Sequence, residues 1–239
     1  MVPVFPGSSA LLQSLRSAFP GAREDSLAAL VGSAAATTYH AGEEIRATDD
    51  VGPPTILVTS GAVARLAKAA DGRDIAYGIL REGELGGISN LANELLGTLS
   101  LVAWTEVTAI RWGRDTVRRL ARADGGLALD LLDRAVGLVE ALALELEIFA
   151  SESACQRTAR VLLRYPDLLF DPDRAALTRT NLTTLMGASR EMMERCLRDL
   201  EARRIVVRTG AAGLVLLDEE ALRLAATEGP AAANRRADD

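Results

Sequence analysis

The pattern of apolar and polar positions divides the chain into regions of different texture. Residues 8–33 hold two weak helical patterns, and from Thr37 to about Trp112 short apolar runs are separated by glycines and acidic turns. Arg114 to Arg122 is amphipathic, and an apolar-rich stretch then runs from about Leu127 to Ala150. Many short strands followed by helices predict an α+β chain in which a small barrel or jelly roll precedes a helical region.

Short strand-like runs recur at regular spacing within the second of these regions. Asp71-Gly72-Arg73 supplies a hairpin tip between two of them, because Asp-Gly suits a tight turn. The runs are Thr55 to Thr59, Ala62 to Leu66, Ile75 to Leu80 and two more between Leu99 and Ile110.

The long apolar-rich stretch predicts a single helix, which at about 1.5 Å per residue would span about 35 Å. Its apolar residues occupy more than one face. We therefore predict that one side packs on the barrel and the other on the same helix of a second copy, with coverage inside one chain as the alternative. The main stripe is Leu131, Ala135, Leu138, Leu142 and Phe149, and further apolar groups are Leu127, Leu132, Val136, Val139, Leu144 and Leu146.

Leu177 to Leu200 has the pattern of two short helices joined by a tight turn. Gly187 allows a positive φ at the turn, and Ser189 is placed to cap the second helix. The first helix has an apolar face of Leu182, Leu185 and Met186. The second divides into an apolar face of Met193, Cys196, Leu197 and Leu200 and a polar face of Arg190, Glu191, Glu194, Arg195 and Arg198.

The polar face of the second helix suits insertion into a DNA groove. An arginine fork matches O6 and N7 of guanine, and a carboxylate accepts from N4 of cytosine, each good pair discriminating by about 1–3 kcal/mol. A solvated polar face is the alternative. Further on, the runs 205–207 and 214–217 predict a two-stranded wing, Asp218 begins a last short helix, and residues from about Thr227 predict a disordered tail.

Net charge changes this picture once it is placed along the chain. The 239 residues carry −6 in total. Between Cys155 and Thr209, however, eleven arginines face seven acidic residues, so that segment is +4 and the remainder is −10. The asymmetry favours a basic nucleic-acid-binding module joined to an acidic one, over chance clustering of arginines.

The remaining reactive side chains favour neither catalysis nor metal binding. Cys155 and Cys196 are the only cysteines, and we predict small buried residues, not a disulfide or a metal site. His40, the only histidine, follows Tyr39 on the first predicted strand, where a packed or surface imidazole is expected in preference to a haem ligand. No Ser, Cys and His arrangement suits an enzyme, and no signal peptide or membrane span is visible, which predicts the cytoplasm.

The helix pair resembles the helix-turn-helix of the CRP/FNR family of bacterial transcription regulators. The likeness is without gaps and rests on Leu177-Thr178-Arg179, Leu182, Leu185, Gly187, Ser189-Arg190-Glu191 and Arg195. It implies a homodimer that binds near-palindromic double-stranded DNA and works with RNA polymerase. By the same likeness Arg190, Glu191 and Arg195 contact bases, and Thr178, Arg179, Thr180 and Ser189 contact phosphates.

The strand region resembles, more loosely, the cyclic-nucleotide-binding jelly roll of that family. The likeness rests on Gly42-Glu43-Glu44-Ile45, Ser60-Gly61, Asp71-Gly72-Arg73 and Glu82-Gly83-Glu84. Relatives place a glutamate for the ribose and an arginine for the cyclic phosphate, and this chain has Gly87 and Gly97 there. Because a buried phosphate needs a cationic partner, cyclic nucleotide binding is not expected unless another arginine, such as Arg111 or Arg114, reaches it. The degenerate pocket positions are Gly86, Gly87, Gly97, Thr98, Leu142 and Ala143; no cofactor is expected, and any ligand is expected to be apolar.

Four segments follow from these predictions. Residues 1–124 form a sensor domain, 125–152 the dimerisation helix and hinge, 153–226 a winged helix-turn-helix and 227–239 a disordered tail. The predicted function is a sequence-specific DNA-binding transcriptional regulator. The alternative is a small-molecule sensor or interaction protein without sequence-selective DNA binding, because Met192 and Glu194 place a bulky apolar group and an acid near the phosphates.

Overall fold

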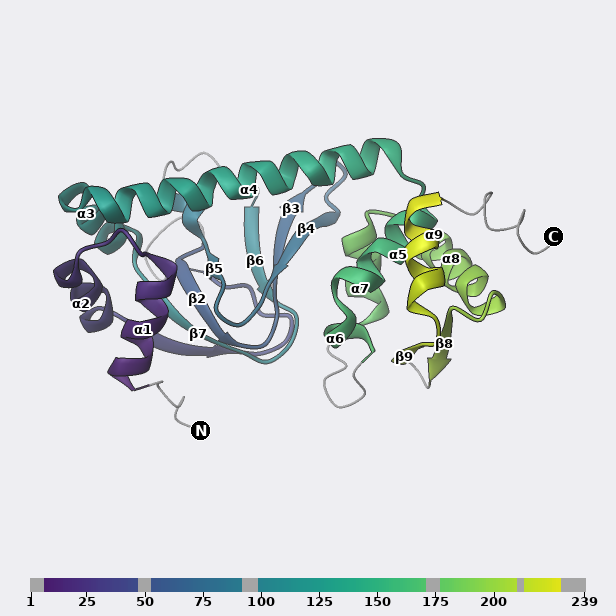
Figure 1. Ribbon diagram of the computed structural model, residues 1–239, viewed down its shortest axis with the longest axis horizontal. Coiled ribbons are helices and arrows are strands. Elements are labelled where there is room, and N and C mark those ends of the chain that lie inside the picture. The colour runs from purple at the N-terminus through teal and green to yellow at the C-terminus, as the bar shows by residue number, and fades with distance from the viewer. Residues whose placement is uncertain (1–6, 47–52, 92–98, 171–176, 210–212, 229–239) are drawn as a thin grey trace. The chain divides into compact units, whose positions relative to one another are not determined.

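A computed structural model of the protein describes residues 7–46, 53–91, 99–170, 177–209 and 213–228 (Figure 1). The chain forms two compact units, one from Met1–Arg73 and Tyr77–Leu142 and the other from Asp74–Ala76 and Ala143–Asp239. The division at Leu142 falls inside a long helix, so the four-part division at 124, 152 and 226 stays a prediction. In the part of the chain that the structure describes, no helix has the length and apolar character needed to span a membrane.

Two β-sheets form the centre of the first unit. One has the strand order β1-β7-β2-β5 and the other β4-β3-β6, and a bulge between Val58 and Ser60 shifts the register of β2 against β7. This is the jelly roll that the strand pattern predicted, and the runs at 55–59, 62–66 and 75–80 are confirmed as strands. The strands are β1 Ala35–Tyr39, β2 Thr55–Ser60, β3 Val63–Lys68, β4 Asp74–Leu80, β5 Leu85–Gly86, β6 Leu99–Ala103 and β7 Val107–Trp112.

Side chains from both sheets meet in one buried cluster. Alternate residues of a strand point to the same face, so each strand contributes every second apolar residue to the space between the sheets. The cluster consists of Tyr39, Ile45, Ile56, Val58, Val63, Leu80, Leu101, Ala103, Val107 and Ala109.

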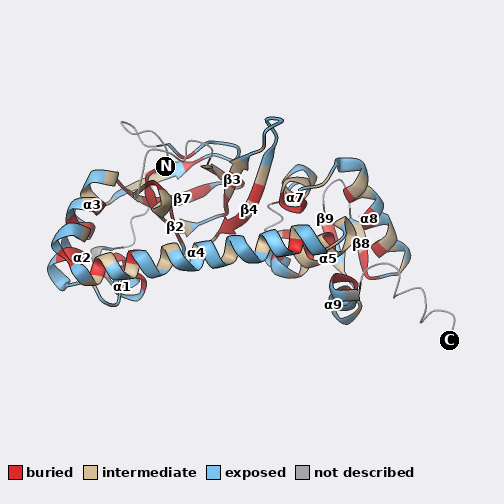
Figure 2. Cartoon of the chain, turned by 90° about the horizontal axis from the view of Figure 1, so that it is seen from above, coloured by how far each residue is buried: buried red, intermediate tan, exposed pale blue. Residues whose placement is uncertain are grey.

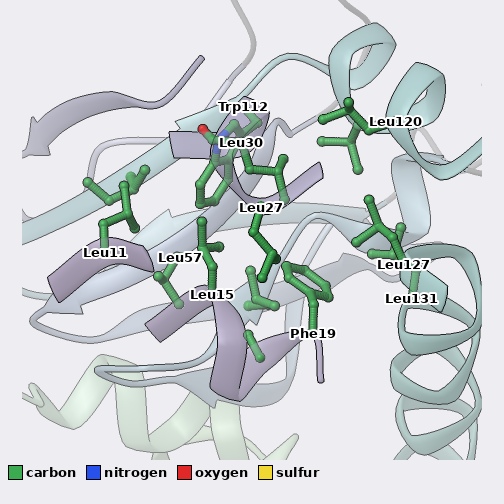
Figure 3. Packing of buried hydrophobic residues seen from close by; sticks show 14 residues of the cluster. Leu11, Leu15, Phe19, Leu27, Leu30, Leu57, Trp112, Leu120, Leu127 and Leu131 are labelled. Carbon is green, nitrogen blue, oxygen red and sulfur yellow. The ribbon is translucent and has the colours of Figure 1, made fainter. Parts of the chain in front are cut away.

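A second buried cluster forms where helices cover the four-stranded sheet (Figure 3). Helices α1 Ser8–Ala18 and α2 Glu24–Gly32 confirm the predicted helical lead-in, and α3 Arg114–Ala123 and the first turns of α4 Gly125–Ser151 complete the cover. The indole N–H of Trp112 donates to the carbonyl oxygen of Leu30 at 2.8 Å, which satisfies a buried donor. Leu127 and Leu131 belong to this cluster and so anchor the start of α4 on the sheet and its covering helices.

The second unit is a set of short helices with a two-stranded sheet. The predicted wing and last helix are confirmed. Pro166 stands at the first position of a short helix, where its fixed φ suits helix initiation and its missing N–H costs nothing. The elements are α5 Ala154–Arg164, α6 Pro166–Leu169, α7 Arg179–Met186, α8 Arg190–Ala202, β8 Val206–Thr209, β9 Gly213–Leu216 and α9 Glu219–Glu228.

Asp124 fixes the start of α4. Its carboxylate accepts from the backbone N–H groups of Gly126 at 3.0 Å, Leu127 at 3.3 Å and Arg23 at 2.8 Å. The side chain of Ser26 and then the Arg23 N–H lower the pKa of Asp124 from 3.8 to about 2. The side chain is only 2% exposed, so the ionised carboxylate depends on these donors in place of water.

We predict that Asp124→Asn lowers the free energy of unfolding of the first unit by about 2 kcal/mol at pH 7, because a pKa held near 2 in place of 3.8 is worth about that much. A lowered pKa means that the contribution is complete above about pH 4 and is lost as the pH falls through about 2. Trp104 and Trp112 are the only tryptophans and both belong to the first unit, so their fluorescence during urea unfolding reports it.

The matched control is Asp133→Asn, at an exposed position of α4. It should change the free energy of unfolding by less than about 0.5 kcal/mol. Equal effects of the two variants at pH 7, or a wild-type advantage that is unchanged below pH 2, would contradict the role of Asp124.

Candidate nucleic-acid interface

Local chemistry fixes both ends of α7. The hydroxyl of Thr178 accepts from the N–H of Asn181 at 3.2 Å, and Oδ1 of Asn181 accepts from the N–H of Thr178 at 2.8 Å, so each satisfies an unpaired donor at the helix start. At the other end Gly187 adopts a φ of 57°, in the left-handed region that favours glycine. The predicted turn with positive φ is confirmed.

The turn at Gly187 is packed against the end of α4. A Cβ at position 187 would lie 2.4 Å from Cε1 of Phe149, so the ring fills the space that any side chain would need. The guanidinium of Arg157 lies 4.9 Å from the centre of the same ring and donates to the carbonyl oxygens of Met186, at 3.1 Å, and Glu152, at 2.7 Å. These contacts, all within the second unit, hold the end of α4 against the turn.

Helix α8 has one buried face and one exposed face, as its spacing predicted. The hydroxyl of Ser189 accepts from the N–H of Met192 at 3.2 Å and caps the helix. Opposite the buried face, Arg190, Glu191 and Arg195 are exposed. The buried face consists of Met193, Cys196, Leu197 and Leu200, none more than 3% exposed.

The exposed groups of α8 have the charges that base contacts require. The backbone N–H of Glu191 itself and then the Ser189 hydroxyl hold the pKa of the Glu191 carboxyl below its usual range, so it is an acceptor at neutral pH. The Nη2 atom of Arg195 lies 2.8 Å from the sulfur of Met192, which steadies the side chain along the helix. Thr178 and Thr180 are exposed at the start of α7, on the chain segment that leads into the turn. That these groups touch bases and phosphates stays a prediction.

Glu194 is engaged by arginines of its own unit. Its carboxylate accepts from Arg179 at 3.1 Å and from Arg208 at 3.2 Å, and its side chain is 20% exposed. Arg208 also donates to Glu201 at 2.6 Å, which lowers the pKa of Glu201 and raises that of Arg208. The network joins α7, α8 and β8. The network also balances the negative charge of Glu194, which had been a reason for the alternative without sequence-selective DNA binding.

Cys155 and Cys196 form a disulfide between α5 and α8, so the prediction of two unlinked cysteines was wrong. The Cα atoms lie 5.0 Å apart, within the range of about 4.4–6.8 Å that a disulfide requires. The two residues are 41 positions apart in sequence, and only the packing of the first turn of α5 against α8 brings them together. Burial of Cys196, at 0% exposed, was correctly predicted.

We predict that Cys155→Ser lowers the free energy needed to open α8 by about 2–4 kcal/mol, because the disulfide closes a long loop in the unfolded chain. Hydrogen–deuterium exchange of α8 peptides measures this opening. A reducing agent should raise exchange in the wild type to the level of the variant and leave the variant unchanged. Exchange in the wild type that does not respond to reduction would contradict a stabilising role for the bond.

The positions expected for an effector pocket are only partly brought together. A cavity of about 260 Å³ lies in the first unit, and Gly86 and Gly87 line it. Leu142 and Ala143 are exposed on α4, and Gly97 and Thr98 lie outside the described residues.

The backbone at Gly87 leaves no room for the glutamate that relatives have there. Its φ is +75°, and a Cβ at this position would lie 1.9 Å from the carbonyl oxygen of Pro54. Any side chain would therefore force the backbone before β2 to move.

Two arginines of the cavity wall, Arg65 on β3 and Arg134 on α4, were not predicted from the sequence. Arg111 and Arg114, the proposed substitutes, are not among the described residues that line it. The place of Arg65 could have been predicted from the sequence, because it stands two residues after the buried Val63 and so belongs to the inward register of β3. The place of Arg134 could not have been predicted, because the side chain of an arginine on a long helix is ordinarily solvated.

The faces of α4 differ in exposure from one another (Figure 2). Within the main predicted stripe, Leu131 is buried in the first unit and Phe149 packs on Gly187 of the second. Other apolar side chains are left exposed at alternating intervals of three and four, the spacing of a two-helix seam. This exposed seam consists of Leu129 at 62%, Leu132 at 55%, Val136 at 47% and Val139 at 64%.

Residues 156–225 match the Crp-like helix-turn-helix domain family. The match covers α5 to α9 up to residue 225, and with it every candidate DNA contact. A search of curated proteins returned no match.

Solved structures of similar fold cover most of the chain. FixK2 from Bradyrhizobium japonicum aligns with a TM-score of 0.65 and 22% identity over 80% of this chain and 96% of its own. The c-di-GMP responsive global regulator CLP of Xanthomonas campestris aligns with a TM-score of 0.66 and 20% identity over 81% and 99%. A CRP/FNR family transcriptional regulator from Thermus thermophilus gives 0.65 and 19% over 80% and 98%. At these identities the likeness establishes the fold.

Proposed function

We propose that this chain is a DNA-binding transcription regulator of the CRP/FNR type, and that it is a homodimer that reads a near-palindromic DNA site through α8. The main support is the exposed face of α8, where Arg190, Glu191 and Arg195 stand opposite a buried apolar face. Readout in a major groove needs a helix that is rigid on one side and presents forked donors and carboxylate acceptors on the other.

Each of the three groups has one base contact that its chemistry favours. Arg190 and Arg195 bind guanine through O6 and N7, and Glu191 accepts from N4 of cytosine. Arg190 and Glu191 belong to the first turn of α8, and Arg195 follows one turn later. Their contacts therefore fall on neighbouring base pairs.

Phosphate contacts come from the ends of the two helices. Thr178 and Thr180 are exposed hydroxyls at the start of α7, and Ser189 stands at the start of α8, where helix N-termini favour anions. Arg179 contributes less than the others, because its pair with Glu194 leaves the side chain 32% exposed. These contacts set the position of α8 on the duplex and carry no sequence information themselves.

The exposed seam of α4 is the proposed dimer contact. Seven-residue repeats with apolar groups three and four apart pair with the same repeat of a second helix. A two-fold dimer would present two α8 helices to half-sites about 34–36 Å apart, which accounts for the proposed palindrome. RNA polymerase is the further partner that we propose for this regulator, from its resemblance to the family.

Cyclic AMP is not the proposed effector. The position that would supply the ribose-binding glutamate is Gly87, and Pro54 fills the space of its missing side chain. Control of DNA binding therefore depends on another ligand or on none.

We predict that Arg190→Ala weakens binding to a selected DNA site by about 1–3 kcal/mol and weakens binding to random DNA much less, because the guanidinium reads a base. Fluorescence anisotropy at one fixed salt concentration measures both affinities. Arg198→Ala, at an exposed position further along α8, is the matched control and should weaken both DNAs alike. If Arg190→Ala also weakens both alike, the residue contacts only phosphate and the proposed reading role is wrong.

We also predict that Val139→Glu weakens the free energy of dimerisation by at least about 2 kcal/mol, which raises the dissociation constant, because it puts an unpaired charge from each copy into the seam. Analytical ultracentrifugation measures the constant. Leu144→Glu is the control: Leu144 is 56% exposed but stands outside the seam spacing, so its dimer should be unchanged. Equal dissociation of the two variants, or none in either, would refute the seam.

A further inference from the structure

Among the described residues that line it, the cavity of about 260 Å³ in the first unit has more positive than negative side chains. Arg65 and Arg134 line it from β3 and α4, and Glu84 is the one acidic residue among the described lining residues. The carboxylate of Glu84 accepts from the backbone N–H of Arg81 at 2.7 Å, in its own turn. Neither arginine stands at a position where relatives bind a cyclic phosphate.

Arg65 is built into the wall of the cavity. Its guanidinium carbon lies 5.9 Å from the centre of the Tyr77 ring, which also lines the cavity. Gly78, with a φ of +154°, provides room: a Cβ there would lie 3.1 Å from Nη2 of Arg65. The Nε atom is buried and has no hydrogen-bond partner among the described residues. A buried donor on a cation that lacks an acceptor is costly, so an acceptor supplied from outside the chain would be bound favourably.

Arg134 is held in place by the chain itself. Its Nε and Nη2 atoms donate to the carbonyl oxygen of Ala18 at 3.1 and 2.6 Å, and its guanidinium lies 5.5 Å from the centre of the Phe19 ring. These contacts fix the fork without neutralising its charge, because a carbonyl and a ring face carry none. A second positive charge is therefore preorganised at the cavity.

We propose that this cavity binds a small organic anion, carrying a carboxylate or a phosphate ester, whose acidic group accepts hydrogen bonds from Arg65. Arg134 supplies the second positive charge, and Leu80, Leu101 and Leu138 of the lining contact the apolar part of the ligand. Arginine suits both acid groups, because its fork matches two oxygens of either one. The cavity volume is slightly below the range of about 300–1,000 Å³ common for ligand sites, which favours a small ligand. The anionic ligand proposed here differs from the apolar ligand expected from the sequence.

Calorimetric titration of the full-length protein at fixed ionic strength tests the site. The probes are succinate, phenyl phosphate and the neutral analogue succinamide. We expect one or both anions to bind with no binding of succinamide, and the anion that binds distinguishes the carboxylate from the phosphate source. Neither anion binding more tightly than about 10 mM, or succinamide binding as tightly as succinate, would overturn the proposal.

Variants of Arg65 assign the binding to this cavity. Arg65→Gln should weaken the bound anion at least ten-fold, whereas Arg46→Gln, at an exposed arginine paired only with Glu44 in the described chain, should leave it unchanged. Arg65→Lys keeps the charge without the fork and should weaken binding by a smaller factor, which provides the test if the glutamine variant does not fold. Unchanged affinity in a folded Arg65 variant, or equal weakening by Arg46→Gln, would overturn the proposal.

The use of this site as an effector site rests on the proposed function, but the binding itself does not. Because the titrations contain no DNA, their failure refutes the site and leaves the DNA-reading proposal standing. A protein that binds the anion but does not select a DNA sequence would refute the proposed function and leave the site.

Discussion

The contact between Phe149 and Gly187 is the constraint on which the DNA-reading part of the structure depends. Gly187 ends α7 in a left-handed conformation and lets α8 begin at Arg190, capped by Ser189. The ring of Phe149 then occupies the space beside Gly187 that a side chain would fill, and the guanidinium of Arg157 packs on that ring. A turn that is fixed in this way sets the direction of α8, because a glycine turn left unpacked could adopt many conformations.

The charges around α8 are arranged so that Glu194 and Glu201 are paired while several arginines remain exposed. Glu194 and Glu201 are engaged by Arg179 and Arg208, in a network that is partly withdrawn from solvent. Arg190, Arg195 and Arg198 stay on the exposed face. A chain with a net charge of −6 can thus present a basic surface to DNA, because most of its acidic residues lie outside this segment and Glu194 and Glu201 are paired within it.

The sequence alone predicted those features that depend on local spacing. The strands of the jelly roll, the long helix, the wing and the two faces of α8 all follow from apolar residues at intervals of two or of three and four, which the fold then buries. The features that it missed depend on distances across the fold. Cys155 meets Cys196 only because α5 packs on α8, and no spacing reveals that.

The cavity shows the same limit. Gly87 was recognised as a missing glutamate, but the reason, a carbonyl oxygen of Pro54 in the space of its Cβ, required the packing of β5 against the start of β2. Arg65 could be placed on the inward register of its strand, whereas its buried Nε and its approach to Tyr77 could not. The resemblance to relatives therefore predicted what the pocket lacks, and the fold was needed to identify what it contains.

In vitro selection with the full-length protein on a random DNA library tests the central claim most directly, that α8 reads sequence. The account predicts an enriched near-palindromic consensus whose half-sites are centred about 34–36 Å apart and contain guanine opposite Arg190 and Arg195. A library that shows no enriched sequence after selection, while the protein still binds DNA, would contradict it.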